Sequence, residues 1–474
     1  MVGLSAVAEA QVPLSGTAIY PERLHEDVEA IRALVDRMHP DPYRYCSRAE
    51  FDRLFDNAID SIKIPLGTNE FLEVLLPIFH RIGDSRLVPE LDRPTDEALH
   101  RDMPVLPLKV RVLEEGLFVD EEMKGFRSIP PGSKVFSING VPAGRLLEKL
   151  GRLVVTDGAN QSLRWHLVEQ DFPWLFHRAF GSTASYSVMI EMPDGGKEER
   201  TLFAMTGAES ERTRKPVADA TLPWGSTWEA ESATLWATLR TMDPGPILAS
   251  GQSSRKFLSS MLKDLRKNNA KTLVLDLRGS DGPELGMAEQ VFATIARSPF
   301  RVVQGMTVRN GPSPEGFALA VSQPEHYASL FDGYEKGSDG FSSLRPDDPR
   351  LELTDPDPDA FAGKVYVVCD GGTRGAAAAL VMLAKRQGRA RVIGEETGTN
   401  AYSFTGGRDL LLVTPNAGIR LRVPLVRYVP DGEPAGPRDH GEVPKQVVQQ
   451  RPWGITKGRD TIRMALLEMI RELQ

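Results

Sequence analysis

Apolar residues at helical spacing predict three helices near the start of the chain. They recur over 24–38 and again over 51–62, and a third helix is expected over 71–82. The segment 39–42 is His-Pro-Asp-Pro, and proline disfavours helix both at itself and at the residue before it. The pattern therefore predicts an N-terminal helical domain over 21–95.

The pattern changes to short β-like runs in the next part of the chain. These runs are separated by Gly and Pro, and they lie at 108–112, 117–119 and 135–138. Asn139-Gly140 marks a tight turn after the last of them. The polar stretch 194–215 is expected to form a hairpin and a linker. We predict a β-rich domain over 96–205, with a domain boundary after it.

Strands and helices alternate in the remainder, 216–474, which is typical of an α/β domain with crossover units. Strands are expected at 272–277 and 365–369, and helices at 287–295 and 376–385. The segment 310–360 is rich in Pro, Asp, Ser and Gly and is expected to be a surface insertion. Further on, Ile419, Leu421 and Val423 alternate with arginines, which predicts a strand with one solvent-facing side, and 460–473 is expected to form the closing helix.

Composition narrows the class of protein. The chain has 474 residues, enough for about three domains, and its net charge is −8. No basic stripe interleaved with aromatics occurs, so nucleic-acid binding is not expected. No run of about 18 apolar residues occurs, so no integral membrane segment is expected. Cys46 and Cys369 are far apart and lack metal-site spacing, and no motif implies a metal or a cofactor.

The first twenty residues allow two interpretations. Ala8-Glu9-Ala10 resembles the end of a secretory signal, but the charged and most of the apolar parts of such a signal are missing. Residues 1–20 are therefore either the remnant of a signal segment or a disordered start. The first interpretation implies a periplasmic or secreted protein, and the second is compatible with a cytoplasmic one.

Several motifs, taken in order, resemble a known family. The segment 129–140 is similar to the turn, strand and Asn-Gly turn of a PDZ domain, and further motifs follow at 273–279, 371–373, 388–390, 393–398 and 440–444. Together they resemble the C-terminal processing (tail-specific, tricorn-core-like) serine peptidases. The resemblance implies a ClpP/crotonase-like α/β peptidase core with crossover βαβ units, a PDZ-like β-rich domain and an N-terminal helical unit.

The resemblance also implies where the catalytic residues should lie, and neither is present. The family's histidine belongs to a turn that here is 83–87, which places Arg86 at the histidine position. The family's serine belongs to a glycine-rich turn that here is 371–377, which places Gly375 at the nucleophile position. Glycine has no nucleophile, and arginine stays protonated and has no acceptor atom for a proton. The lysine base of some members maps near Asn400. These replacements predict a catalytically degenerate peptidase.

Such a site can still bind. Gly375 and Ala376 lie at the start of a predicted helix, whose free N–H groups favour an anion. The family fold would bring Arg86 to them, with Arg374 and the turn that contains Gly279 and Ser280 nearby. We therefore predict a pocket for a carboxylate, as in a peptide or a protein C-terminus. The alternative is that Arg86 pairs with Asp84 or with solvent.

Three further hypotheses stay open. Ser403 or Thr373 could serve as a relocated nucleophile of an active serine endopeptidase, although a base must then lie within hydrogen-bond reach. The chain could instead be a structural or regulatory paralogue that self-associates or pairs with an active relative. The PDZ-like segment could hold a peptide terminus by itself, with 125–129 as its carboxylate-binding loop. His80 is expected to be a packed helix residue, and His39, His166 and His177 are expected to have no carboxylate or metal partner, since none lies at useful spacing. Glu395 and Glu396 are expected to lie at the rim of the site.

Overall fold

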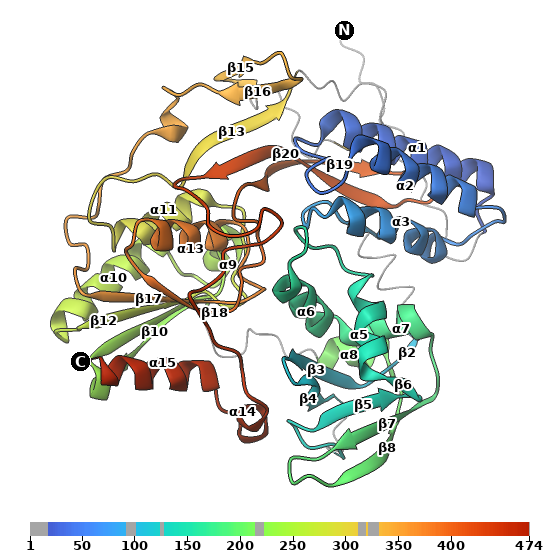
Figure 1. Ribbon diagram of the computed structural model, residues 1–474, viewed down its shortest axis with the longest axis horizontal. Coiled ribbons are helices and arrows are strands. Elements are labelled where there is room, and N and C mark those ends of the chain that lie inside the picture. Colours follow the sequence, from blue (N-terminus) through green and yellow to red (C-terminus); the bar gives the residue numbers. More distant parts are fainter. Residues whose placement is uncertain are drawn as a thin grey trace.

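The computed structural model describes residues 18–91, 101–123, 128–213, 222–310, 319–320 and 331–473. The predicted signal remnant, most of the loop 125–129 and part of the segment 310–360 lie outside these residues. The described parts form a mixed α/β structure (Figure 1). None of the described helices is long and apolar enough to span a membrane.

The three N-terminal helices are present as predicted. They are α1 (Pro21–Met38), α2 (Arg48–Ser61) and α3 (Thr68–Ile82), and each begins three residues before the apolar pattern does. Residues that favour the start of a helix precede the apolar pattern and account for this difference. Pro21 occupies the first turn of α1, and the Ser47 side chain accepts a hydrogen bond from the Glu50 N–H at the start of α2.

The β-rich part contains the predicted strands, but also helices that the pattern did not predict. The strands β3 (Leu108–Leu113), β4 (Gly116–Glu122), β5 (Lys134–Ile138), β7 (Ser185–Glu191) and β8 (Lys197–Phe203) form a sheet in that order, and β6 (Val141–Pro142) pairs with β5. The unpredicted helices are α5 (Ala143–Gly151), α6 (Gln161–Gln170) and α7 (Phe172–Phe180). Helix α6 fully buries only Leu163 and Val168, so its sequence carries no clear apolar stripe.

The polar stretch 194–215 is a hairpin only at its start. The hairpin of β7 and β8 is present as predicted, but the linker is not. Instead β9 (Met205–Thr206) pairs with β2 (Pro104–Val105), and α8 (Gly207–Thr213) follows. Polarity alone does not distinguish a linker from a short, solvent-exposed helix, which explains the error.

The core sheet is mostly parallel, as the alternating pattern predicted. Its strands are β10 (Trp224–Glu229), β11 (Thr234–Leu239), β12 (Thr272–Asp276), β17 (Lys364–Cys369), β18 (Arg391–Gly394) and β21 (Gln446–Val447), in that order. Every pair except β10 with β11 is parallel. Figure 1 shows the helices α10 (Ser254–Lys267), α11 (Leu285–Ala293) and α13 (Ala376–Arg386) on one side of this sheet and α15 (Thr461–Glu472) on the other.

A second sheet links this core to the N-terminal helices. Its order is β14 (Leu319–Ala320), β19 (Phe404–Val413), β20 (Arg420–Pro430), β13 (Val303–Arg309), β16 (Phe341–Leu344) and β15 (Tyr334–Lys336). The segment 310–360 is therefore not only an insertion, since β15 and β16 belong to this sheet. Strand β20 has the predicted solvent-facing side, because Leu421 and Val423 are buried and Arg422 is exposed. It also pairs with β1 (Pro89–Glu90), directly after α3.

Candidate functional site

The turn that follows α3 is held by a buried carboxylate. Asp84 Oδ2 accepts hydrogen bonds from His39 Nε2 at 2.9 Å and from the Thr405 hydroxyl at 2.6 Å, and Asp84 Oδ1 accepts from the Arg86 N–H at 2.9 Å. Burial would raise the pKa of Asp84, but the hydrogen bond and charge of His39 and the charge of Arg44 hold it well below its ordinary value. Asp84 is therefore ionised and fixes the backbone that carries Arg86.

His39 was expected to have no carboxylate partner, and that expectation was wrong. It is fully buried and meets Asp84 across 45 residues of sequence. A second buried carboxylate, Asp157, accepts from the Ser85 N–H at 2.8 Å and from the Asn400 N–H at 3.1 Å. Burial, followed by the charge of Asp84, raises the pKa of Asp157. The turn that carries Arg86 is thus fixed from two sides.

The glycine-rich turn leads from β17 into α13, and Gly375 lies where the helix begins. Its φ of 55° lies in the left-handed region, which favours glycine. The Gly375 N–H donates to Thr399 Oγ1, and the Ala376 N–H donates to the Gly282 carbonyl, both at 2.9 Å. The N–H groups of Gly375 and Ala376 are therefore already hydrogen-bonded within the chain.

A side chain at position 375 would collide with its surroundings. A Cβ atom there would lie 2.5 Å from the Gly282 carbonyl oxygen, 2.7 Å from Arg86 Nη2 and 3.1 Å from Asp281 Oδ1. The first of these atoms belongs to the backbone, which cannot rotate away as a side chain can. The site has therefore closed around the glycine.

The structure brings Arg86 and Arg374 together around Asp281. Arg86 Nη2 forms an ion pair with Asp281 Oδ1, and Arg374 Nη1 lies 3.7 Å from Asp281 Oδ2. Burial opposes ionisation of Asp281, but the charges of Arg86 and then Arg374 hold its pKa below the ordinary value. The ion-pair partner of the Arg86 guanidinium is thus Asp281, a carboxylate beside the nucleophile position, whereas Asp84 bonds only to the Arg86 backbone N–H.

Two buried polar atoms near Asp281 have no hydrogen-bond partner among the described residues. They are Ser280 Oγ, in a fully buried residue, and Arg374 Nε. The Gly279 N–H donates to Asp370 Oδ1 at 2.8 Å. All the residues of the predicted carboxylate pocket therefore lie in one region, with Asp281 among them.

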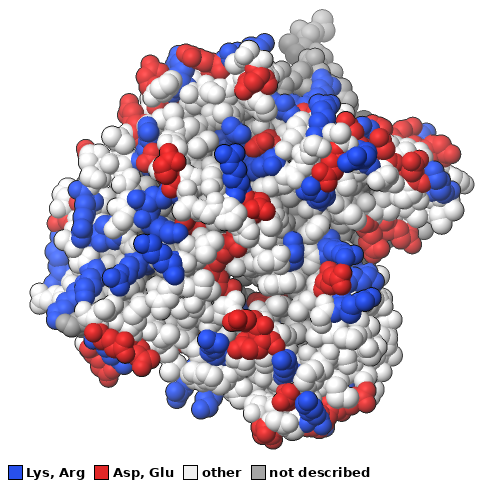
Figure 2. Space-filling view, viewed as in Figure 1, with Lys and Arg blue, Asp and Glu red and all other residues white. Residues whose placement is uncertain are grey.

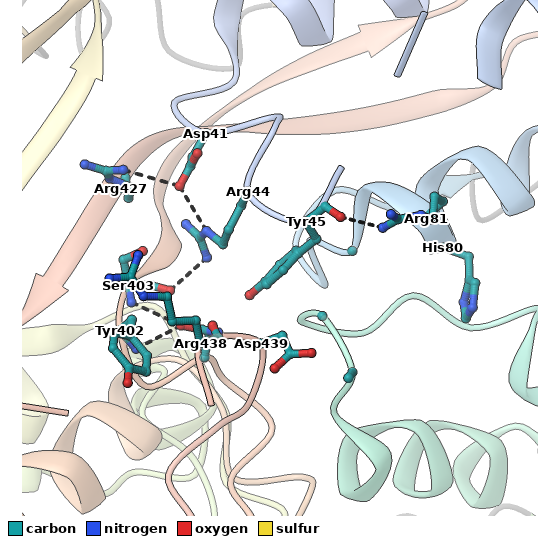
Figure 3. Close-up of a pocket in the computed structure, with 14 residues that line it drawn as sticks. Asp41, Arg44, Tyr45, His80, Arg81, Tyr402, Ser403, Arg427, Arg438 and Asp439 are labelled. Carbon is teal, nitrogen blue, oxygen red and sulfur yellow. Dashed lines mark hydrogen bonds and ion pairs between the residues drawn. The ribbon is translucent and has the colours of Figure 1, made fainter. Parts of the chain in front are cut away.

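The two alternative nucleophiles lie in different surroundings. Thr373 is fully buried, and its hydroxyl donates to the Leu277 carbonyl at 2.8 Å, so it stabilises the turn. Ser403 lines a cavity of about 730 Å³ behind the Arg86 turn (Figure 3). His80 lies at the far end of this view from Ser403, and His80 Nδ1 bonds to the Val154 carbonyl at 2.8 Å. Arg44, which reaches the Ser403 carbonyl at 2.8 Å, cannot act as a base.

Sequence reasoning also gave no role to His166. Its ring lies against Gly372, in the glycine-rich turn, and the residue sits on α6, which the sequence pattern did not predict. Burial lowers the pKa of His166, and the charge of Asp370 opposes this shift. No local sequence signal connects His166 with a turn about two hundred residues later.

An open cleft lies beside this region. Its volume is about 550 Å³, and it is lined by Gly279, Asp370 and Glu395 from the core and by Arg111 and Asp120 from β3 and β4. Glu395 therefore lies at the rim, as predicted. Glu396 instead accepts hydrogen bonds from His440 Nδ1 at 3.0 Å and from the Gly441 N–H at 2.6 Å. No group of three or more metal-ligating side chains occurs in the described parts of the chain.

Glu169 fastens α6 to the outer strand of the β-rich sheet next to this cleft. Glu169 Oε1 accepts from the Val112 N–H at 2.6 Å, and Glu169 Oε2 lies 3.2 Å from Arg111 Nη1. Burial raises the pKa of Glu169 to about 7, although the charge of Arg111 opposes this. Strand β3 ends the sheet, so this carboxyl occupies an N–H group that an added strand would otherwise use.

This raised pKa predicts a pH dependence of stability. The folded protein binds the Glu169 proton more tightly than the unfolded chain does, so this stabilisation is present below the ordinary value of 4.5 and is lost as the pH rises through about 7. We expect the free energy of unfolding of the unmodified protein to fall by roughly 1–3 kcal/mol between pH 5 and pH 8 through this group. Glu169→Gln should abolish this fall. Urea unfolding across that range measures this free energy, and the same pH dependence in both proteins would contradict the prediction.

Comparisons with known proteins give the same assignment of the fold. The model of peptidase family S41 matches residues 241–434. The structure of mature CPAF complexed with lactacystin superposes with a TM-score of 0.68 at 12% identity, covering 96% of this chain and 98% of that one. A crystal structure of mature CPAF gives 0.66 at 12% identity, covering 96% and 97%. The photosystem II D1 C-terminal processing protease gives 0.42 at 15% identity, covering 92% and 96%. A search of curated proteins found no similar sequence.

Proposed function

We propose that this chain, whose residues 241–434 match the model of peptidase family S41, uses that family's fold to bind peptides or protein C-termini without hydrolysing them. One observation carries the proposal. At the position where the family resemblance expects the nucleophile, Gly375 is enclosed by the Gly282 carbonyl and by the ion pair of Arg86 with Asp281. Acyl transfer by the serine mechanism needs both a nucleophile and a base, and neither position supplies one.

The remaining chemistry suits recognition of a carboxylate. Arg86 and Arg374 supply planar guanidinium donors, which match the two oxygens of a carboxylate. Asp281 now occupies them as an internal carboxylate, and an open cleft of about 550 Å³ lies beside Gly279. A peptide terminus would therefore compete with Asp281, whose side chain is 35% exposed and can move out toward solvent.

This competition predicts the effect of Asp281→Asn. Removing the charge frees Arg86 and Arg374, so we expect peptides with a free C-terminal carboxylate to bind about tenfold more tightly. Fluorescence anisotropy with labelled peptides measures this affinity, and the same peptides with an amidated C-terminus should show no gain. Arg86→Ala in the Asp281→Asn background should cancel it.

The control variant is Asp60→Asn, because the Asp60 side chain is 80% exposed on an N-terminal helix. It changes the net charge equally and should leave the affinity unaltered. Equal binding of free and amidated peptides, or a gain in the control, would argue against carboxylate recognition at this site.

Hydrolysis is tested separately. The purified chain is incubated with a diverse peptide library, and products are followed by mass spectrometry beside Ser403→Ala and Thr373→Ala. We expect no cleavage above the buffer blank. Cleavage that disappears in Ser403→Ala or in Thr373→Ala would establish a relocated nucleophile and refute the degenerate site. Absence of both cleavage and peptide binding would favour the structural or regulatory paralogue.

A further inference from the structure

A second pocket lies at the opposite end of the core sheet from Gly375. Its volume is about 590 Å³, and it opens where β12, β17 and β18 begin. Five basic residues line it, namely Lys271, Arg297, Lys364, Arg389 and Arg391. The glycine-rich turn instead follows the end of β17, so the two sites lie at opposite ends of the strands.

Among the residues that the structure describes, carboxylates do not balance the charge of this pocket. The other lining residues are glycine, alanine, valine, leucine and tyrosine, so the lining holds five cations and no anion. Within the described parts of the chain, none of the five cations has a carboxylate partner within 4.0 Å. Figure 2 shows Lys and Arg gathered on the left of the view, over the region where β12 and β17 start in Figure 1. This is unusual in a chain whose net charge is −8.

Arg389 is the most informative of these residues because it is 7% exposed and still lacks a carboxylate. Its Nε bonds to the Ile295 carbonyl, and its Nη2 lies 2.5 Å from the Phe361 carbonyl and 3.1 Å from the Gly363 carbonyl. Burial, together with the charge of Arg297, lowers the pKa of Arg389 to about 10. Buried charges are ordinarily paired, so the carbonyls hold the guanidinium in place while its charge stays uncompensated.

The four exposed cations that line the pocket lie around this buried one, next to four elements. Lys364 and Arg391 stand at the first positions of β17 and β18, and Lys271 directly precedes β12. Arg297 follows α11 and donates to the Ala362 carbonyl at 3.4 Å. Parallel strand starts that lie side by side thus present their basic side chains to one pocket. Mutual repulsion among them costs free energy that an incoming anion would recover.

We propose that this pocket binds a small polyanion, a compound with a phosphate group or with several carboxylates. The guanidinium and ammonium donors match anionic oxygens, and a volume of about 590 Å³ suits a compact molecule rather than a folded partner. The inference does not depend on peptide binding beside Gly375.

The pocket is connected to the first site by one buried helix. Helix α13 begins directly after Gly375 and ends at Arg386, three residues before Arg389, and almost all of it is buried. Its eleven residues span about 16 Å at 1.5 Å per residue.

The test titrates the full chain with pyrophosphate, inorganic phosphate and citrate by calorimetry at constant ionic strength. We expect saturable binding at one site and a higher Tm with the bound anion. Tighter binding of pyrophosphate than citrate identifies a phosphate ligand, and the reverse order identifies a polycarboxylate. Lys364→Gln combined with Arg391→Gln should weaken binding at least about tenfold. Arg389 is left unchanged because its carbonyl contacts support the fold.

The matched control combines Lys63→Gln with Arg145→Gln, two exposed residues that lie in the loop after α2 and on α5. It removes the same charge and should retain the affinity. Without anion, the pocket variant should keep or raise its Tm, because it removes like charges. No saturable binding of any of the three anions would overturn the proposal. Equal losses in both double variants, or a lower Tm with unchanged affinity in the pocket variant, would also overturn it.

Discussion

Asp84→Ala is expected to lower the free energy of unfolding by about 3–5 kcal/mol at pH 7, the cost of breaking a buried ion pair by removing one partner. The variant leaves His39 and the Thr405 hydroxyl without their acceptor and removes one of the carboxylates that face the charge of Arg44. It also releases the N–H of Arg86, so the turn loses its anchor. Urea unfolding followed by circular dichroism measures the loss.

Asp60→Ala serves as the control, with an expected change within about 0.5 kcal/mol, since its side chain is 80% exposed. The pH dependence gives a second check. Because the folded pKa of Asp84 lies below 3.8, its stabilisation is present above that value and is lost as the pH falls through the folded pKa. The difference between wild type and Asp84→Ala should therefore shrink in acid. A loss no larger than in Asp60→Ala would contradict the anchoring role.

Gly375→Ala is expected to destabilise the protein by about 2–4 kcal/mol. About 1–2 kcal/mol of this arises from placing a Cβ on a left-handed backbone. The rest arises from overpacking, because that Cβ would lie 2.5 Å from the Gly282 carbonyl oxygen. Restoring the family's residues as Gly375→Ser with Arg86→His should therefore not create a peptidase. Thermal unfolding and a peptide cleavage assay measure the two effects.

Gly388→Ala separates the two contributions. Gly388 has a similar φ of 62°, but a Cβ there would meet no atom within 4 Å. This variant should show the cost of a Cβ at a positive φ without overpacking. A larger loss in Gly375→Ala then reflects the close surroundings of position 375 together with its ψ of −126°. Equal destabilisation in both, or peptide cleavage by the double variant, would show that the site has room for a serine.

The sequence predicted the elements whose apolar pattern is regular. The N-terminal helices and the parallel strands of the core agree with it because each buries one stripe or a continuous run. Helix α6 was missed because its apolar residues form no clear stripe and its contact with β3 is polar, through Glu169 on the Val112 N–H. The short helix α8 was missed because a short polar helix and a linker have similar composition.

The candidate site was only partly predictable. The family resemblance located Arg86 and Gly375, and the structure brings these two positions into contact. It could not show that Asp281 is the partner of Arg86, because the two lie 195 residues apart. The same holds for His39 with Asp84. Pairing of charges across a fold depends on tertiary geometry, and no local pattern records it.

The packing of α1 against the region of β20 has a consequence for the synthesis of the chain. Leu421 and Val423 of β20 belong to the same apolar core as Leu24 and Val28 of α1, and Asp27 of α1 accepts hydrogen bonds from the Asn416 and Ala417 N–H groups. At ~5–20 residues per second, the ribosome supplies β20 on the order of tens of seconds after α1. The N-terminal helices thus leave the ribosome well before the strand that covers them, and their apolar faces need protection until β20 has emerged.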